Sequence, residues 1–169
     1  MSGNDDGAFR VVSGSGSGAA LELAVSATLD HETTTDYRLV VAAVDGGAPP
    51  RTGHVTVHVS VADSNDNRPV FDAATYSTTV REDAEVGTTV ARVRATDSDS
   101  GANGRVRYHV DRTRCDVSGQ FEVDAVTGAV YTTQPLDYDV VQLYELIVVA
   151  ADHGPQSLRS SAVVSVQVS

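Results

Sequence analysis

An internal repeat of 107 residues constrains this chain more than any other feature of its sequence. LDHETTTDYRLVVAAVDGG begins at Leu29 and LDYDVVQLYELIVVAADHG begins at Leu136, and the two copies align over 19 residues without a gap. Upstream, GAF at Gly7–Phe9 aligns with GQF at Gly119–Phe121 at an offset of 112. Because this offset exceeds 107 by five, the first copy carries five extra residues between the two aligned segments. We place these in its SGSGSG stretch, which reads as a flexible loop. The 169 residues therefore hold one full copy and the back half of another.

The repeat predicts two domains, a C-terminal part of one repeat in residues 1–67 and a complete repeat in residues 68–169. The first domain lacks the opening three strands of its unit. A half unit of this kind leaves one sheet edge unpaired and one apolar face uncovered. We therefore expect residues 1–67 either to be loosely ordered or to be covered by something else, such as a second chain.

Apolar residues alternate with polar ones along most of the chain, which is typical of β-strands. In HVTVHVSVAD, for example, Val55, Val57, Val59 and Val61 share one face. Clusters of Gly, Pro, Asn and Asp break the pattern into short segments. The predicted strands lie near residues 19–25, 36–44, 53–62, 74–80, 88–95, 105–110, 119–123, 129–133, 143–151 and 158–168. Seven of them follow residue 70, which is enough for a small β-sandwich.

The acidic residues are short and gathered between the predicted strands. All 12 basic residues are Arg, whereas 17 of the 23 acids are Asp and the formal net charge is -11. Asp is unfavourable in strands and favourable in turns, and short carboxylates in loops suit a hard cation such as calcium. A merely solvated acidic surface is the alternative. Nucleic-acid binding is disfavoured because the chain has no basic stripe.

Four acidic clusters stand at predicted strand ends. The join between the two copies reads DSNDNRPVF, and the other clusters are LDHE, TDSDSGANG and AADHG. Alternate residues of an extended chain point to the same side, so Asp30 with Glu32 and Asp97 with Asp99 each form a two-pronged clamp. Calcium takes six to eight oxygen ligands, which several such segments together can supply. The chain contains no twelve-residue EF-hand loop.

DSNDN, LDxE, DxDxGxNG, the REDA element at Glu82 and AxDxG resemble cadherin repeats in order and spacing, over nearly the whole chain. The resemblance implies tandem Greek-key β-sandwich repeats, the first one truncated, with up to three calcium ions at the junction between them. It implies these calcium ligands: Asp30, Glu32, Asp63, Asn65, Asp66, Asn67, Asp97, Asp99, Asn103 and Asp152.

Only one of the three implied ions has its complete family ligand set in this sequence, namely Asn65, Asn67, Asp97, Asp99, Asn103 and Asp152. The other two ions also need a Glu from the missing opening half of the first repeat, whose counterpart in the second copy is Glu82. By the same resemblance, Glu82, Asp137 and Asp139 serve a following junction and Asp45 a preceding one. Asp139 stands where the family has Glu, so its reach is shorter.

The resemblance implies a calcium-dependent cell-adhesion protein. Calcium would stiffen the joint between repeats, and other cadherin ectodomains would bind homophilically or heterophilically. The chain has no Trp, which excludes Trp-anchored strand exchange, and its Lys-free surface resembles protocadherin, Fat or Dachsous repeats. We expect an extracellular location on a membrane-anchored parent, with this segment soluble. The alternatives are a non-adhesive spacer and a cadherin-like module of a microbial secreted protein.

The residue spacings in this chain do not match the motifs that would indicate an enzyme. Cys115 is the only cysteine and has no matching catalytic partners, so we read it as a structural thiol. His54 and His58 share a strand face but have no third ligand. No G-x-S-x-G elbow is present, and SGSGSG is not followed by the Lys of a phosphate-binding loop. The opening MSGNDDGAF lacks the apolar region of a secretory signal.

Overall fold

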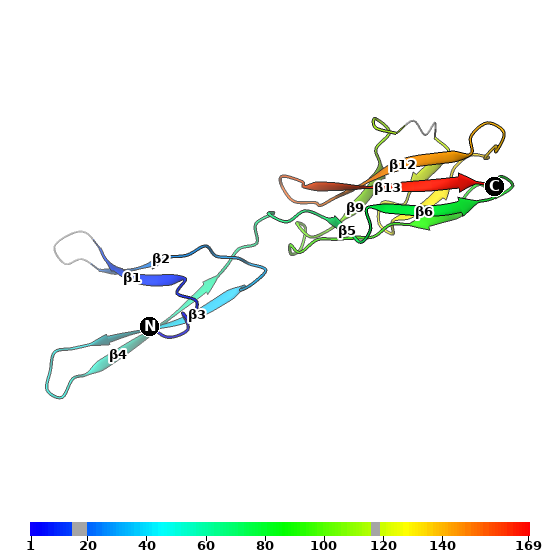
Figure 1. Ribbon diagram of the computed structural model, residues 1–169. Coiled ribbons are helices and arrows are strands. Elements are labelled where there is room, and N and C mark those ends of the chain that lie inside the picture. Colours follow the sequence, from blue (N-terminus) through cyan, green and yellow to red (C-terminus); the bar gives the residue numbers. More distant parts are fainter. Residues whose placement is uncertain (15–19, 116–118) are drawn as a thin grey trace. The chain divides into compact units, whose positions relative to one another are not determined.

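The computed structural model describes residues 1–14, 20–115 and 119–169 and divides the chain into two units, Met1–Asp63 and Ser64–Ser169. Every regular element in the described part is a β-strand, which confirms the all-β prediction (Figure 1). The described residues contain no helix with the length and hydrophobicity that crossing a bilayer requires. The predicted insertion in SGSGSG extends into residues 15–19, outside the described residues.

The second unit consists of two larger sheets and one short strand pair. The four-stranded sheet has the order β6, β13, β12, β9, with the bounds Thr75–Val80, Arg159–Val168, Leu143–Ala151 and Arg107–Val110. The three-stranded sheet has the order β10, β11, β7, with the bounds Phe121–Val123, Ala129–Thr132 and Thr89–Arg92. The short pair joins β5 (Val70–Phe71) to β8 (Ala95–Thr96). All pairings are antiparallel except that of β13 with β6.

The core of the second unit is packed by the inner faces of these sheets. Along β12, the alternate residues Tyr144, Leu146, Val148 and Ala150 are buried, as the period-two pattern requires. From the three-stranded sheet, Phe121 meets them with a fully buried ring, 5.1 Å from the Tyr144 ring in an edge-to-face arrangement. Full burial of one such side chain contributes about 1.5–3 kcal/mol, so this core holds the complete sandwich together.

Among its described residues, the first unit contains two antiparallel strand pairs. β1 (Phe9–Ser13) pairs with β2 (Leu21–Val25), and β3 (Asp36–Val44) pairs with β4 (Thr52–Ser60), each in its own antiparallel sheet. Its buried cluster is correspondingly small and consists of Ala8, Phe9 and Leu39. At the edge of β3, Val40 forms an isolated antiparallel bridge with Ser2.

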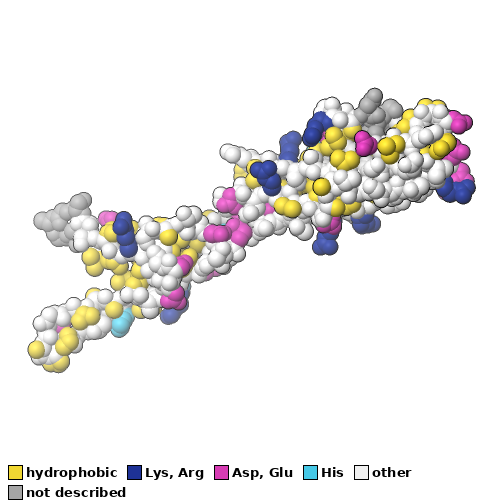
Figure 2. Space-filling view, in the orientation of Figure 1, with side chains coloured by type: hydrophobic (Ala, Val, Ile, Leu, Met, Phe, Trp, Pro, Cys, Tyr) yellow, Lys and Arg dark blue, Asp and Glu magenta, His cyan; other side chains and the backbone are white. Residues whose placement is uncertain are grey.

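As expected for a half unit, apolar surface of the first unit lies open. Leu21 is 67% exposed, Val44 63% and Val55 58%. An apolar groove of about 390 Å³ runs between the two strand pairs and includes Leu21 and Val55 in its lining. Figure 2 shows the yellow hydrophobic side chains that gather over β1 and β4. In the second unit, Val80 of β6, Val90 of β7 and Val110 of β9 pack in the corresponding core.

The strand predictions agree best where the strands are long. The segments 36–44 and 143–151 match β3 and β12 to the residue. β1 and β5 were not predicted, and the single strand expected at 88–95 is in fact two, β7 and β8. The reason is a change of partner, since β7 pairs with β11 whereas β8 pairs with β5. Alternation within one segment does not reveal which strand lies beside it.

Candidate metal site

Two loops of the second unit meet the segment that opens it. Asn65 Nδ2 donates hydrogen bonds to Asp152 Oδ1 at 3.1 Å and to the Gln156 carbonyl at 2.8 Å. A Cβ added at Gly154 would lie 2.2 Å from Asn65 Nδ2 and 2.9 Å from Asn103 Oδ1. Asn65, Asn103 and Asp152 therefore converge around a position that only glycine can occupy.

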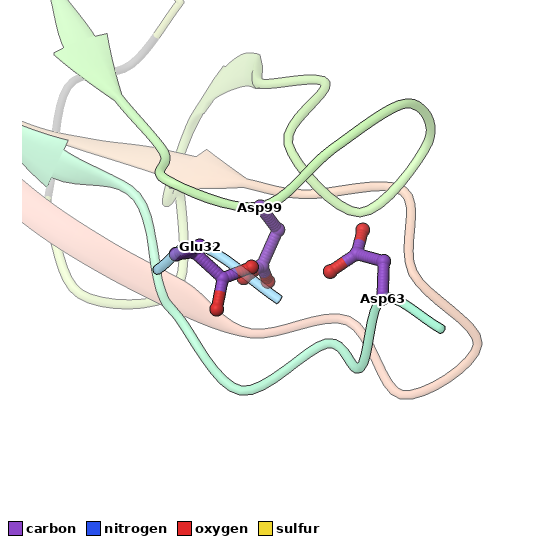
Figure 3. Close-up of side chains that lie close together, drawn as sticks. All are labelled: Glu32, Asp63 and Asp99. Carbon is purple, nitrogen blue, oxygen red and sulfur yellow. The ribbon is translucent and has the colours of Figure 1, made fainter. Parts of the chain in front are cut away.

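Two residues further on, Asn67 joins the loop that follows β8. Its backbone N–H donates to Asp99 Oδ2 at 3.2 Å, and its Nδ2 donates to Asp99 Oδ1 at 2.7 Å. The Asp99 N–H in turn donates to Asp97 Oδ1 at 3.0 Å. Asn67, Asp97 and Asp99 thus form a second hydrogen-bonded group, and Figure 3 labels the Asp99 side chain on its loop.

These two groups contain all six residues that the sequence predicted as the complete ligand set of one calcium ion. All six belong to the second unit, and alternate positions of the Asn65–Asn67 segment hold one group each. The site brings together side chains that are up to 87 residues apart in the chain. Carboxylates and amide carbonyls in this number are the donor set that calcium prefers.

The electrostatics of the site fit a hard cation. Asp99 is 7% exposed and Asp152 is 4% exposed. Neither carboxylate forms an ion pair with an arginine among the described residues. Asn65 Oδ1 is buried and accepts no hydrogen bond from any residue that the structure describes. Buried acids without a counter-charge and a buried carbonyl without a donor are costly, and a bound divalent cation would relieve both costs.

Several residues that hold the site were not among the predicted ligands. The Tyr108 hydroxyl is buried and accepts a hydrogen bond from the Ala95 N–H at 2.8 Å, just before the Asp97 loop. A Cβ at Gly104 would lie 1.9 Å from the Asp99 carbonyl oxygen. The glycines of DxDxGxNG and AxDxG carried a signal for close backbone approach, whereas nothing in the local sequence pointed to Tyr108.

The first unit holds two of the predicted ligands near one another. A carboxylate oxygen of Glu32 and one of Asp63 lie within 4.8 Å, and Figure 3 labels both side chains. Asp30 instead caps its own turn, accepting from Thr33 Oγ1 at 2.8 Å and from the Glu32 N–H at 3.0 Å. The hydrogen bond from Thr33 is the main cause that lowers the pKa of Asp30 below 3.8. Asp66 accepts from Asn67 Nδ2 at 3.0 Å.

The residues predicted to serve neighbouring junctions are separate from this site. Glu82 Oε2 accepts from the Tyr138 N–H at 3.1 Å, so Glu82 lies beside the turn that carries Asp137 and Asp139. The Asp139 N–H donates to Asp137 Oδ1 at 3.0 Å. In the first unit, Asp45 accepts from the N–H groups of Gly47 and Arg51 at 3.0 and 2.8 Å. Each of these residues stays a predicted partial ligand.

Comparison with known proteins assigns the family. A family model described as the Cadherin domain matches residues 1–62 and 76–169. Protein dachsous of Drosophila melanogaster is 44% identical over 170 residues, which cover 99% of this chain and 5% of that protein. Protocadherin Fat 4 of Mus musculus is 40% identical over 171 residues, covering 99% of this chain and 3% of that protein. The structure of mouse clustered PcdhgC3 EC1-3 matches with a TM-score of 0.88 at 35% identity, covering 95% of this chain and 52% of that one.

The chain belongs to the cadherin family. It consists of extracellular cadherin repeats of the kind found in Dachsous, Fat and protocadherins, which confirms the predicted subfamily, fold and location. Cadherin domains are adhesion modules, so the prediction that the chain is not an enzyme is also confirmed. The chain spans only a small fraction of the curated relatives it matches.

Proposed function

We propose that this chain is a segment of a membrane-anchored adhesion ectodomain whose repeats are stiffened by calcium and bind other cadherin ectodomains. The convergence of Asn65, Asn67, Asp97, Asp99, Asn103 and Asp152 carries the calcium part of this proposal. Family membership supports the adhesive part. The relatives compared are animal cadherins, which favours an adhesion protein over a microbial secreted module.

Charge explains why calcium would stiffen the joint. Of the ten predicted junction ligands, seven are carboxylates, contributed from both sides of the boundary in the sequence. About seven negative charges repel one another, and three divalent cations would bring about six positive charges. A cation that binds the folded ligand set and not the unfolded chain stabilises the fold by mass action. Ions that share ligands from two repeats would also oppose bending between them.

The calcium proposal has a matched pair of variants within the chain. Asp152 accepts from the Gly154 and Leu158 N–H groups, both at 2.9 Å, two and six residues further along. Asp45, its equivalent in the first repeat, accepts from the residues at the same two spacings. Asp152→Asn and Asp45→Asn therefore make the same substitution in equivalent turns, although Asp152 accepts through both carboxylate oxygens and Asp45 through Oδ1 alone. Only Asp152 belongs to the complete ligand set.

We expect calcium to raise the melting temperature of the wild-type chain relative to EGTA. In isothermal titration calorimetry, Asp152→Asn should weaken the site with the complete ligand set at least about tenfold, which is about 1.4 kcal/mol. Asp45→Asn should bind as the wild type does. Equal calcium binding by both variants would refute the proposal. A wild-type melting temperature that is the same in calcium and in EGTA would also refute it. Calcium-dependent aggregation of coated beads would test adhesion separately.

A further inference from the structure

Basic side chains gather on the outer face of the sheet β6–β13–β12–β9, next to its edge strand β9. Arg107 on β9 and Arg159 on β13 both pair in register with Ala151 of β12, so all three share one face. This face is turned away from the core, since the next residue along β12, Ala150, is fully buried. Neighbouring strands are about 4.8 Å apart, so the two arginines stand about 10 Å from each other across β12.

Two more basic residues follow the same edge strand. His109 is exposed and pairs with Val149, which puts it on the outer face two positions after Arg107. Arg105 is exposed and lies two positions before Arg107, in the segment that leads into β9. We call Arg105, Arg107, His109 and Arg159 the basic patch.

The arginines of the basic patch are not neutralised by acids. Among the described residues, none of the three forms an ion pair, whereas Arg81 is 2.7 Å from Asp83 and Arg112 contacts Glu122. Dissolved salt screens charges that are more than about 8 Å apart at physiological ionic strength. The local row of arginines, rather than the net charge of -11, therefore decides what this face attracts, and it attracts anions.

A polar groove of about 450 Å³ opens on the same face, and its lining includes His109 and Arg159 of the basic patch. Ser161 and Thr113 also line it, and both are exposed. Val149 contributes little apolar surface, because it is only 7% exposed. Hydroxyl, imidazole and guanidinium groups donate hydrogen bonds, so this lining suits an oxygen-rich ligand.

The groove also contains an acid, Asp111, whose carboxylate is engaged within its own loop. Asp111 Oδ1 accepts hydrogen bonds from the Thr113 N–H at 3.1 Å and from Thr113 Oγ1 at 2.6 Å, and Oδ2 lies 4.0 Å from Arg114 Nη1. The Asp111 side chain is 19% exposed, whereas that of Arg114 is 59% exposed. Asp111 thus holds the loop that follows β9, and Arg114 adds a further exposed cation to the groove.

We propose that the basic patch and this groove bind a sulfated polysaccharide of the extracellular surface. Such a polymer carries anionic groups on successive sugar rings, so it presents a regular line of anions to the row of arginines. The planar guanidinium fork of arginine suits oxyanions, because it donates two parallel hydrogen bonds. Ring hydroxyl groups between the sulfates can pair with Ser161 and Thr113. The proposal goes beyond calcium binding and adhesion, and it does not depend on either.

The residues among the arginines favour a polysaccharide over other anionic partners. A surface that binds an anionic membrane combines basic side chains with exposed apolar ones that enter the lipid. Here the residues between the arginines are Ala151, the exposed Ser161 and the nearly buried Val149. An acidic peptide would meet the arginines but lacks the ring hydroxyl groups that the polar lining of the groove can bind.

The test is the affinity of the whole chain for a heparin oligosaccharide, measured by isothermal titration calorimetry at physiological ionic strength and fixed calcium. Arg107→Gln combined with Arg159→Gln should weaken binding at least about tenfold. Arg107→Lys combined with Arg159→Lys keeps the charge and should bind more tightly than the Gln pair. Added salt should weaken binding by the wild type.

The chain offers a matched control for the Gln pair. Arg92 and Arg94 are exposed and flank the buried Val93, and Arg92 belongs to β7 of the other sheet. Arg92→Gln combined with Arg94→Gln changes the net charge by the same amount and should leave the affinity for heparin within about twofold of the wild type. A calcium-dependent melting shift that is the same in both pairs shows that the fold and the metal site are intact.

Several outcomes would overturn the proposal. They are a wild type that does not bind the heparin oligosaccharide, a Gln pair that binds as the wild type does, an equal loss in the control pair, or a Lys pair that binds no better than the Gln pair. Desulfated heparin, poly-aspartate and phosphatidylserine vesicles are titrated alongside. Binding of any of these as tightly as heparin would reject a sulfated polysaccharide as the specific ligand. Loss of calcium binding or of bead aggregation in the wild type would reject the proposed function and leave this site untouched.

Discussion

The four strands of the first unit have counterparts in the second at the same register, but the two units bury them very differently. β3 and β12 are both nine residues long, and each pairs with its neighbour over nine consecutive positions. Phe9 and Tyr37 form an edge-to-face pair at 4.9 Å, as their equivalents do in the second unit at 5.1 Å. Yet Val148 and Ala150 are fully buried, whereas Val41 is half-buried and Ala43 exposed.

The difference shows which structural features are local and which depend on the whole repeat. Pairing between adjacent strands, the aromatic contact and the Asp-capped turns form in a half unit. Burial of the remaining inner face needs β6, β7 and β9, for which the first unit has no counterpart among its described residues. The strongest available tests therefore change equivalent positions in the two units and compare the results.

The largest expected effect comes from deleting the same core side chain in each unit. Leu146 and Leu39 are equivalent, and both are 0% exposed. Leu146→Ala should destabilise the second unit by about 2–5 kcal/mol, because a rigid core cannot close around the cavity. Leu39→Ala should cost less, because fewer fixed neighbours surround it. Urea titration followed by residue-resolved NMR measures both units in one sample. A greater loss from Leu39→Ala than from Leu146→Ala would contradict the comparison.

A smaller effect is expected from adding one methyl group to a glycine. Gly104→Ala places a Cβ against the Asp99 carbonyl oxygen and should cost about 1–3 kcal/mol through backbone displacement. A Cβ added at Gly53 on β4 would meet no atom of another described residue within 4 Å, its chain neighbours aside. Gly53→Ala should therefore be neutral or slightly stabilising. Thermal unfolding measures both variants. Similar melting temperatures of Gly104→Ala and Gly53→Ala would show that the backbone around Gly104 can shift to accommodate a Cβ at little cost.

The smallest expected effect is a pH dependence in the first unit. Hydrogen bonds from the Arg51 and Gly47 N–H groups lower the pKa of Asp45 below 3.8. A carboxyl group whose folded pKa is lowered stabilises the fold above its unfolded pKa, and this stability is lost as the pH falls through the folded value. Asp45→Asn should therefore reduce the loss of stability between about pH 5 and about pH 3. NMR titration should give an Asp45 midpoint below 3.8, and a midpoint above it would remove the basis of the prediction.

Much of the fold could be predicted because its signals are local. The repeat offset of 107 located equivalent strands, and alternation located β3 and β12 to the residue. The candidate ligand set was predicted from ordered motifs and resemblance, and six of its ten members lie in two neighbouring groups of the second unit. The two-residue strands β5 and β8 could not be predicted, because two residues are too few to show an alternation of apolar and polar side chains.

By itself, the sequence determined the family and the all-β class, and it predicted a truncated first repeat and a set of candidate calcium ligands. Only the tertiary structure decided that Asp99 and Asp152 are buried and that Gly104 and Gly154 allow the loops to meet. The physical reason is distance along the chain. A periodic pattern or a turn motif depends on neighbours within a few residues, whereas burial arises from strands and loops that meet across tens of residues.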